Sequence, residues 1–265
     1  MSDAALAAFI APRTTVARGM RRWVRDYSSM LIWHLVSLRM WLVTLTVVQI
    51  LSGVGFVLGI ALFFTNIPTR AALFVSTGVP VINLLMVGFI LGPQLVADQR
   101  SSGTYEYLRS VPVSRSVTAA AWYTVCLIGG VPAMIVSLVV AQLRYGLPLD
   151  VSPMIVPAVL MTSLAGTMLG YAIAHAIPSP MATRLITQLG VFVIFGFAPI
   201  LFPLAQMPGW LGDVNWWFPF RHMAVVIRAA LTSVPDSTVT QGYVVLAIWV
   251  IASAAAAGWA LGHRR

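Results

Sequence analysis

The stretch Ala97-Asp-Gln-Arg-Ser-Ser-Gly-Thr-Tyr-Glu-Tyr-Leu-Arg-Ser-Val-Pro-Val-Ser-Arg115 decides the fold, because it separates two long apolar runs, Leu73–Ala97 and Val117–Gln142. Only 9% of the residues are charged, and the five charged side chains in this stretch need water around them. Each apolar run is long enough to cross a bilayer. We therefore expect a short, water-exposed segment between two membrane spans, where a partner could push on the spans.

The whole chain repeats this pattern of long apolar runs. Apolar residues make up 59% of the sequence and the mean hydropathy is +0.90, which is too apolar for a soluble domain. These features predict an all-α polytopic membrane protein, with a tail at 1–21 and one transmembrane domain at 22–265. The six predicted spans are 41–64, 73–97, 117–142, 153–175, 185–206 and 243–261.

The distribution of arginines predicts the orientation of the spans. The chain has no lysine, and its net charge of +9 comes from arginine alone. With the N-terminus inside, twelve arginines fall on the inner side and four on the outer side. The inner ones are Arg13, Arg18, Arg21, Arg22, Arg25, Arg39, Arg100, Arg109, Arg115, Arg184, Arg264 and Arg265, and the outer ones are Arg70, Arg144, Arg221 and Arg228. This bias predicts that both termini are cytoplasmic. The arginine excess is explained by topology, so we expect no nucleic-acid partner.

Several function classes are disfavoured by missing side chains. A P-loop needs a lysine that reaches the phosphates, so this chain is not expected to be an ATPase or another enzyme by itself. No Asp, Glu, Lys or Arg lies in the middle of a predicted span, which disfavours an ion-coupled secondary carrier. His175 lies at the end of a predicted span with no other potential metal ligand near it in the sequence. We therefore expect a structural role for it, without a catalytic or metal-binding cluster.

Two further segments differ from plain loops. Residues 22–40 place Trp23, Tyr27 and Leu31 on one side and charged residues on the other, which predicts an amphipathic helix in the membrane interface. The alternative is an inward extension of the first span. Residues 207–241 begin with Met-Pro-Gly-Trp-Leu and include a cluster of aromatic residues, which predicts a re-entrant or interfacial helical hairpin on the outer face.

Polar and aromatic side chains within the spans predict a pathway for an amphipathic substrate, with packing between helices as the alternative. The pathway candidates are Gln49, Ser52, Phe56, Asn83, Gln188, Phe192 and Phe195. Three Gly-x-x-x-Gly pairs permit close helix packing. We expect them to pack inside the chain, with a subunit interface as the alternative for the first. These pairs begin at Gly55, Gly166 and Gly258.

The charged stretch itself predicts a short helix over 101–111. Ser101 or Ser102 is a suitable N-cap, and Pro112 would end the helix. Tyr105 and Leu108 would form an apolar seat against a partner or the lipid surface, while Glu106 and Arg109 would offer paired charges. A plain solvated loop would not need this pattern.

The spacing of these residues resembles a known family. Asp98-x-x-x-x-Gly103-Thr104-x-Glu106-x-Leu108-x-x-x-Pro112-Val113-Ser114-Arg115 is similar to the coupling segment of type-2 ABC exporter permeases. The pattern Pro208-x-Trp210-Leu211, Pro219-Phe220 and Arg228-x-x-Leu231 is similar to the hairpin before that family's last span. Asp98 stands where the family usually has Glu, Tyr105 where it has Leu, and Trp216-Trp217-Phe218 replaces an Asn-containing approach.

The resemblance implies the membrane subunit of a bacterial ABC exporter, located in the plasma membrane among its lipids. It would pair with a second permease, identical or related, and with separate ATPase chains that bind ATP and Mg²⁺, so this chain would hold no cofactor. The expected substrate is an amphipathic drug or lipid, with a polysaccharide or teichoic-acid-type lipid conjugate as the alternative and a secondary carrier as a more distant one. The implied ATPase-coupling residues are Asp98, Arg100, Gly103, Thr104, Tyr105, Glu106, Leu108, Arg109 and Arg115.

Overall fold

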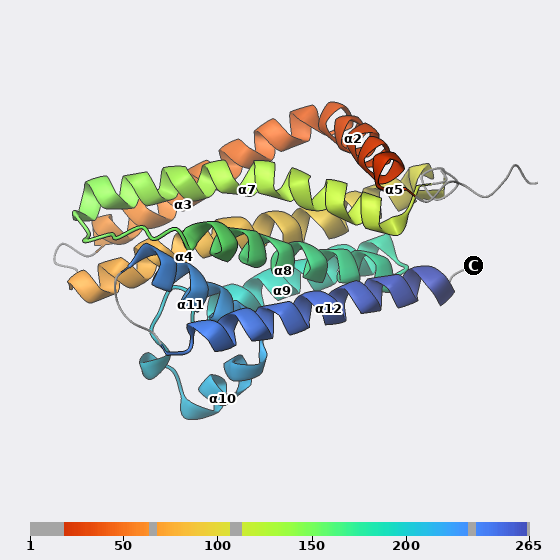
Figure 1. The fold of residues 1–265 in the computed structure, drawn as a ribbon. Helices are drawn as coiled ribbons and strands as arrows, with labels where there is room; N and C mark the ends of the chain where they lie inside the picture. Colours follow the sequence, from red (N-terminus) through yellow and green to blue (C-terminus); the bar gives the residue numbers. More distant parts are fainter. Residues whose placement is uncertain (1–18, 64–67, 107–112, 233–236, 264–265) are drawn as a thin grey trace, which may run out of the picture.

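The structure is a computed structural model that describes residues 19–63, 68–106, 113–232 and 237–263 (Figure 1). These residues form helices joined by short connections, and no strand occurs among them. Six helices in this part of the chain are long and apolar enough to cross a membrane. The predicted all-α polytopic fold with six candidate spans is therefore confirmed.

The second span is composite. It consists of α4 (Thr69–Met86), a π-helical turn (Val87–Leu91) and α5 (Gly92–Ser101), which together form one continuous helix of 33 residues. The other spans are α3 (Arg39–Phe63), α7 (Arg115–Tyr145), α8 (Ile155–Ala176), α9 (Pro180–Phe197) and α12 (Val239–His263). The shorter helices are α2 (Met20–Ser37), a 3₁₀ turn (Leu204–Gln206), α10 (Gly209–Trp217) and α11 (Pro219–Leu231).

The composite span forms the centre of the bundle. Of its most apolar part 83% is buried, compared with 17% for both α3 and α9. The side chains of Val81, Leu84 and Leu85 are almost completely buried. Because little of α3 and α9 is covered by the rest of the chain, their apolar faces are available to lipid or to another protein.

Glycine allows the central span and α8 to pack at very short distance. A Cβ atom at Gly88, in the π-helical turn, would lie 2.6 Å from the backbone of Thr167, and one at Gly170 would overlap Gly88. Internal packing is therefore confirmed for the pair that begins at Gly166. It is wrong for Gly55 and Gly59, where no other helix among the described residues lies within 4 Å of a Cβ position.

The spans alternate in direction, so their ends gather at two ends of the bundle (Figure 1). We call one the Arg115 end: it contains the end of α5, the starts of α7 and α9, and the end of α12, and α2 packs against α7 there. The other is the Arg228 end, which contains α10 and α11. The described arginines that were predicted to be inner gather at the first end and those predicted to be outer at the second.

The start of the predicted short helix differs from the structure. Ser101 is the last residue of α5 and Ser102 is its C-cap, so neither is an N-cap. The left-handed Gly103, with φ of 77°, then turns the chain, and a new helical segment starts at Thr104. The second span was predicted to end at Ala97, but its helix continues to Ser101. Its polar last turn keeps the helical backbone hydrogen bonds.

Candidate functional sites

The first candidate site is the turn that follows α5 at the Arg115 end. Asp98 on α5 forms an ion pair with Arg184 on α9. Arg100 donates a hydrogen bond to the carbonyl oxygen of Ile177, in the connection between α8 and α9. These two contacts fix the end of the second span to the start of α9.

Tyr105 packs on the same arginine. The guanidinium carbon of Arg100 lies 4.7 Å from the centre of the Tyr105 ring, within the range of a cation–π contact. The Tyr105 ring also lies 6.2 Å from the ring of His175, which in turn lies 4.1 Å from that of Tyr171. Tyr105 is half-buried and Glu106 is exposed. The turn after α5 therefore rests on the end of α8 while its acidic side chain faces outward.

The structure describes only some of the other residues predicted for this turn. Thr104 shares a hydrogen bond of 3.0 Å with Ser102, which supports the turn at Gly103. Leu108 and Arg109, which were predicted to continue the seat and the paired charges, lie outside the described residues. The same holds for Pro112, the predicted end of the helix.

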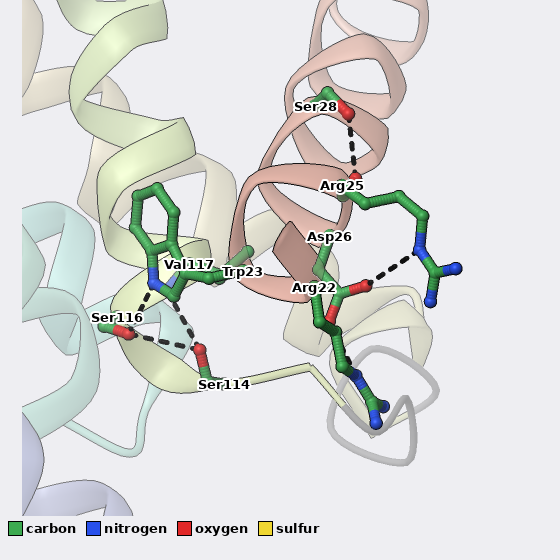
Figure 2. Close-up of polar contacts among 8 residues, drawn as sticks. All are labelled: Arg22, Trp23, Arg25, Asp26, Ser28, Ser114, Ser116 and Val117. Atoms are coloured by element: carbon green, nitrogen blue, oxygen red, sulfur yellow. Dashed lines mark hydrogen bonds and ion pairs between the residues drawn. The ribbon is translucent and has the colours of Figure 1, made fainter. Parts of the chain in front are cut away.

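The start of α7 is held by two neighbours. Ser114 caps the helix by accepting a hydrogen bond from the Val117 amide, and Trp23 on α2 donates to the hydroxyl of Ser116 at 3.2 Å (Figure 2). Arg115 donates to the carbonyl oxygens of Gly258 and Leu261 on α12, at 3.1 and 3.4 Å. A displacement of the start of α7 would therefore also move α2 and α12, which are bonded to it.

Helix α2 contacts α7 over more than one turn. Its ring stack of Trp23 and Tyr27, with centroids 5.4 Å apart, faces α7, and the Tyr27 hydroxyl shares a hydrogen bond of 2.7 Å with Thr124. On the side shown in Figure 2, Arg22 and Asp26 form an ion pair at 3.3 Å. The amphipathic pattern of residues 22–40 thus serves contact with α7 on one side.

The second candidate site is a groove of about 330 Å³ between α3, α4 and α9. Five of the seven predicted pathway residues line it, namely Gln49, Ser52, Phe56, Asn83 and Phe195. The other two, Gln188 and Phe192, are not among its lining residues and are exposed on α9. No charged side chain lines the groove, which contains mainly aliphatic and aromatic groups.

Within the groove, aromatic and amide groups have separate roles. The rings of Phe56 and Phe195 stack with centroids 6.0 Å apart, so they join α3 to α9. Asn83 is buried, and its amide nitrogen donates to the carbonyl oxygen of Ala133 and to the hydroxyl of Ser137, both at 3.1 Å. The amide of Asn83 therefore ties α4 to α7, in agreement with the alternative of packing between helices.

A third cluster, at the Arg228 end, was not predicted. Arg228 on α11 donates from Nε to the Thr77 hydroxyl and from a terminal nitrogen to the Ile200 carbonyl oxygen, both at 3.0 Å. These bonds fix the α10–α11 segment to α4. The signal in the sequence was a single arginine within the apolar run Met223–Leu231, which needs polar partners when it packs against other helices.

The comparison with known families agrees with this arrangement. A family model described as ABC-2 family transporter protein matches residues 63–259, which is most of the chain and includes the turn after α5 and the α10–α11 segment. No curated protein matches the chain. Members of this family are the membrane components of ABC transporters and associate with separate ATPase subunits. The chain belongs to the ABC-2 family of transporter proteins and is a permease of an ABC transporter.

Proposed function

We propose that this permease exports an amphipathic drug or lipid across a bacterial plasma membrane, driven by partner ATPases at the Arg115 end. In this orientation the Arg115 end and both termini lie in the cytoplasm. The excess of arginine at the Arg115 end supports this orientation. Helix α2 would lie in the inner interface, and α10 and α11 would form a re-entrant hairpin on the outer side.

The observation that carries the proposal is the set of contacts around the turn after α5. The cation–π contact of Arg100 with Tyr105 and the ion pair of Asp98 with Arg184 join this turn to α8 and α9. Arg115, on the other side of the turn, is bonded to α12. A partner that moves this turn would therefore displace the second span, α7, α8, α9 and α12 together. The seven described coupling residues, Asp98, Arg100, Gly103, Thr104, Tyr105, Glu106 and Arg115, transmit that movement.

The exposed Glu106 is the contact point for the partner. It borders a hollow of about 350 Å³ beside Tyr105 and His175. A carboxylate at this position attracts an Arg or Lys of the ATPase, and loss of one member of a desolvated charge pair costs about 2–5 kcal/mol. Nucleotide binding must favour one position of this turn over another in order to drive transport.

The groove between α3, α4 and α9 supports an amphipathic substrate. Its aromatic pair, Phe56 and Phe195, offers adaptable apolar contact, while Gln49 and Ser52 offer a few hydrogen bonds. A site without fixed charge does not suit a small ion. Gln188 and Phe192 belong to the exposed side of α9 and would meet the substrate only from a second permease.

A second permease would pack on α3 and α9. Both helices leave most of their apolar surface uncovered, and no other described helix lies within 4 Å of a Cβ position at Gly55 or Gly59 on α3. A pair of glycines four residues apart lets a second helix approach closely. The groove opens beside these helices, so two copies would enclose the substrate path between them.

The test is the assembled complex with its partner ATPase in proteoliposomes. Glu106→Ala should leave membrane insertion unchanged but weaken co-purification of the ATPase or abolish substrate-stimulated ATP hydrolysis, and Tyr105→Ala should do the same. Asp213→Ala, which removes an exposed carboxylate on α10, and Ser237→Ala are the matched controls. Wild-type hydrolysis and co-purification in both Glu106→Ala and Tyr105→Ala would show that this turn is not the contact.

A further inference from the structure

A partly open cavity of about 300 Å³ lies beside the turn that follows α5, which we call the coupling turn, at the Arg115 end. Its walls come from α2, α5, α7, α8 and the end of α12. It shares no lining residue with the groove between α3, α4 and α9. The cavity is therefore a separate space, and its volume is at the lower end of the range for small-molecule sites.

Two buried polar side chains in its wall have no partner in the part of the chain that the structure describes. Both ring nitrogens of His34 and the indole nitrogen of Trp122 lack a hydrogen bond, although each side chain is only 5% exposed. Both residues line the cavity. A buried N–H without an acceptor is unfavourable, so these groups favour a ligand that brings a hydrogen-bond partner into the cavity.

The polar groups of the cavity wall are arranged along one helix face. Arg115, Thr118 and Trp122 follow one another on α7 at spacings that place them on the same side, and all three line the cavity. From Arg115 to Trp122 the helix rises about 10 Å. The row begins with an exposed cation and ends with a buried N–H donor.

The facing walls combine apolar side chains with the polar groups of Gln99, Tyr171 and His175. Met30 on α2, Leu95 on α5 and Leu261 on α12 all line the cavity. Next to the Trp122 indole stands Gly92, where a Cβ atom would lie 3.2 Å from Nε1. The missing side chain at Gly92 thus leaves room for an acceptor atom beside this N–H.

We propose that this cavity binds an acyl glycerophosphate, with its phosphate at Arg115 and its ester carbonyl oxygen at the indole N–H of Trp122. Arg115 gives one N–H of each terminal nitrogen to Gly258 and Leu261, and the N–H groups that remain on its guanidinium suit a phosphate. The carbonyl oxygen supplies the acceptor that the buried N–H needs, and the first methylenes of the acyl chain lie along Leu95 and Met30. His34 gives the ligand a second polar contact deep in the cavity.

The same chemistry is present in a soluble lysophosphatidate and in an anionic phospholipid of the bilayer. In either case the ligand contacts α2, α7, α8 and α12 at once, behind the turn that we assign to the ATPase. The site would therefore bind a regulatory or structural amphiphile, in addition to the substrate in the groove.

The test uses the purified full-length chain in non-ionic detergent, with binding followed by native mass spectrometry. The probes are 1-dodecanoyl-glycerol-3-phosphate, its 1-dodecyl ether analogue, which lacks the carbonyl group, and 1-dodecanoylglycerol, which lacks the phosphate. Wild-type protein should bind one ester phosphate per chain, about three- to tenfold more tightly than the ether, since one hydrogen bond is lost.

Two variants test the carbonyl contact. Trp122→Phe removes the N–H, and Gly92→Ala places a methyl group against it in a helix that tolerates alanine. Each should weaken binding of the ester about three- to tenfold and leave binding of the ether within about twofold. Trp33→Phe, which removes an indole N–H from a neighbouring ring outside the cavity lining, is the control.

One variant tests the phosphate contact. Arg115→Gln should weaken both phosphate probes about tenfold or more and leave the neutral glycerol probe unchanged. Arg184→Gln, at the same end but outside the cavity, is the control. Phospholipid that co-purifies with wild type and is lost from Arg115→Gln would identify the bilayer as the source, whereas binding of the probe without co-purified lipid would identify a soluble amphiphile.

Equal affinities of the ester and the ether probe for wild type would overturn the proposal. The same holds if Trp122→Phe and Gly92→Ala weaken both probes alike, because the carbonyl would then have no specific donor.

Discussion

The guanidinium carbon of Arg228 on α11 lies 3.9 Å from the centre of the Phe74 ring on α4. The same guanidinium donates hydrogen bonds to Thr77 and to Ile200. One side chain therefore joins the segment before the last span, the start of the central span and the connection that follows α9. If α10 and α11 form the outer hairpin, this arginine fixes the outer end of the bundle.

Replacement of Arg228 should loosen this end. Arg228→Met keeps most of the apolar stem but removes two charge-assisted hydrogen bonds and the cation–π contact, at a cost of about 2–4 kcal/mol. We expect a lower unfolding temperature in detergent and faster labelling of a cysteine placed in α11. Arg144→Met, at the same end of the bundle, removes an exposed arginine whose guanidinium carbon lies 5.7 Å from the centre of the neighbouring Tyr145 ring. An unfolding temperature as high for Arg228→Met as for Arg144→Met would contradict the role of Arg228.

Gly53 and Gly55 provide a matched pair of sites on α3. A Cβ atom at Gly53 would lie 2.9 Å from the amide nitrogen of Asn83, whose hydrogen bonds join α4 to α7. A Cβ atom at Gly55 would have no neighbour within 4 Å in the helices that the structure describes. Because alanine has the same helix propensity at both sites, Gly53→Ala should lower the unfolding temperature and Gly55→Ala should not. The comparison is made on the chain purified as a monomer in detergent, and equal shifts for the two variants would contradict the packing described for Asn83.

Substitution at Gly55 also tests whether a second permease packs on α3. If another copy packs on α3, a larger side chain at Gly55 should separate the two helices, as at other small-residue contacts between membrane helices. We expect Gly55→Leu to reduce the dimer fraction in mild detergent, as measured by light scattering or native mass spectrometry. Val43→Phe, which is exposed on the same helix but about a third of a turn away from the Gly55 face, controls for added bulk. An unchanged dimer fraction in Gly55→Leu would exclude this face as the interface.

The spans could be predicted from sequence because each apolar run is long enough to cross a bilayer and charged residues mark its ends. The groove was predicted in part for a different reason. Gln49, Ser52 and Phe56 on α3 are polar or aromatic exceptions in an apolar helix, and such exceptions gather where helices leave space. Their position beside Phe195 followed from packing and not from any local pattern.

The failures also have physical causes. Helix α9 has polar residues on more than one side, so polarity does not show which side faces the bundle. Thr183, Thr187 and Ile194 are buried there, whereas Gln188 and Phe192 are exposed. Serine is a common N-cap residue, which is why the sequence predicted a helix start at Ser101. The helix α5 instead extends to Ser101, because the chain first turns at the left-handed Gly103. The cavity behind the coupling turn depends on Gly92 and Trp122, which are 30 residues apart in the sequence and meet only in the fold.

The orientation of the bundle can be tested with two single cysteines in a Cys126→Ser background. Ser102 lies at the Arg115 end and Ser237 directly precedes α12 at the opposite end. Because the arginine-rich end is expected to face the cytoplasm, an impermeant thiol reagent on intact cells should label Ser237→Cys and not Ser102→Cys. Labelling of both after permeabilisation is the control. Labelling of Ser102→Cys in intact cells would reverse the orientation and remove the basis for ATPase contact at this turn.

The last prediction concerns acid stability and His34. Burial lowers the pKa of His34 from 6.5 to about 4, so the native protein keeps this imidazole neutral where the unfolded chain takes up a proton. The unfolded state therefore binds more protons between these two pH values, and stability falls as the pH decreases through this window. Over the full window the contribution of this one group is on the order of 3 kcal/mol.

His34→Leu should remove this contribution, because the replacement is apolar, of similar size and has no proton to take up. We expect the unfolding temperature of wild type in detergent to decrease from pH 7 to pH 4.5, and that of His34→Leu to decrease less. At pH 7 the variant should be at least as stable as wild type, since the buried nitrogens of His34 have no hydrogen bond to lose within the described part of the chain. Parallel pH profiles for the two proteins would mean that His34 is accessible to protons in the native state, in contradiction to its burial between α2 and α7.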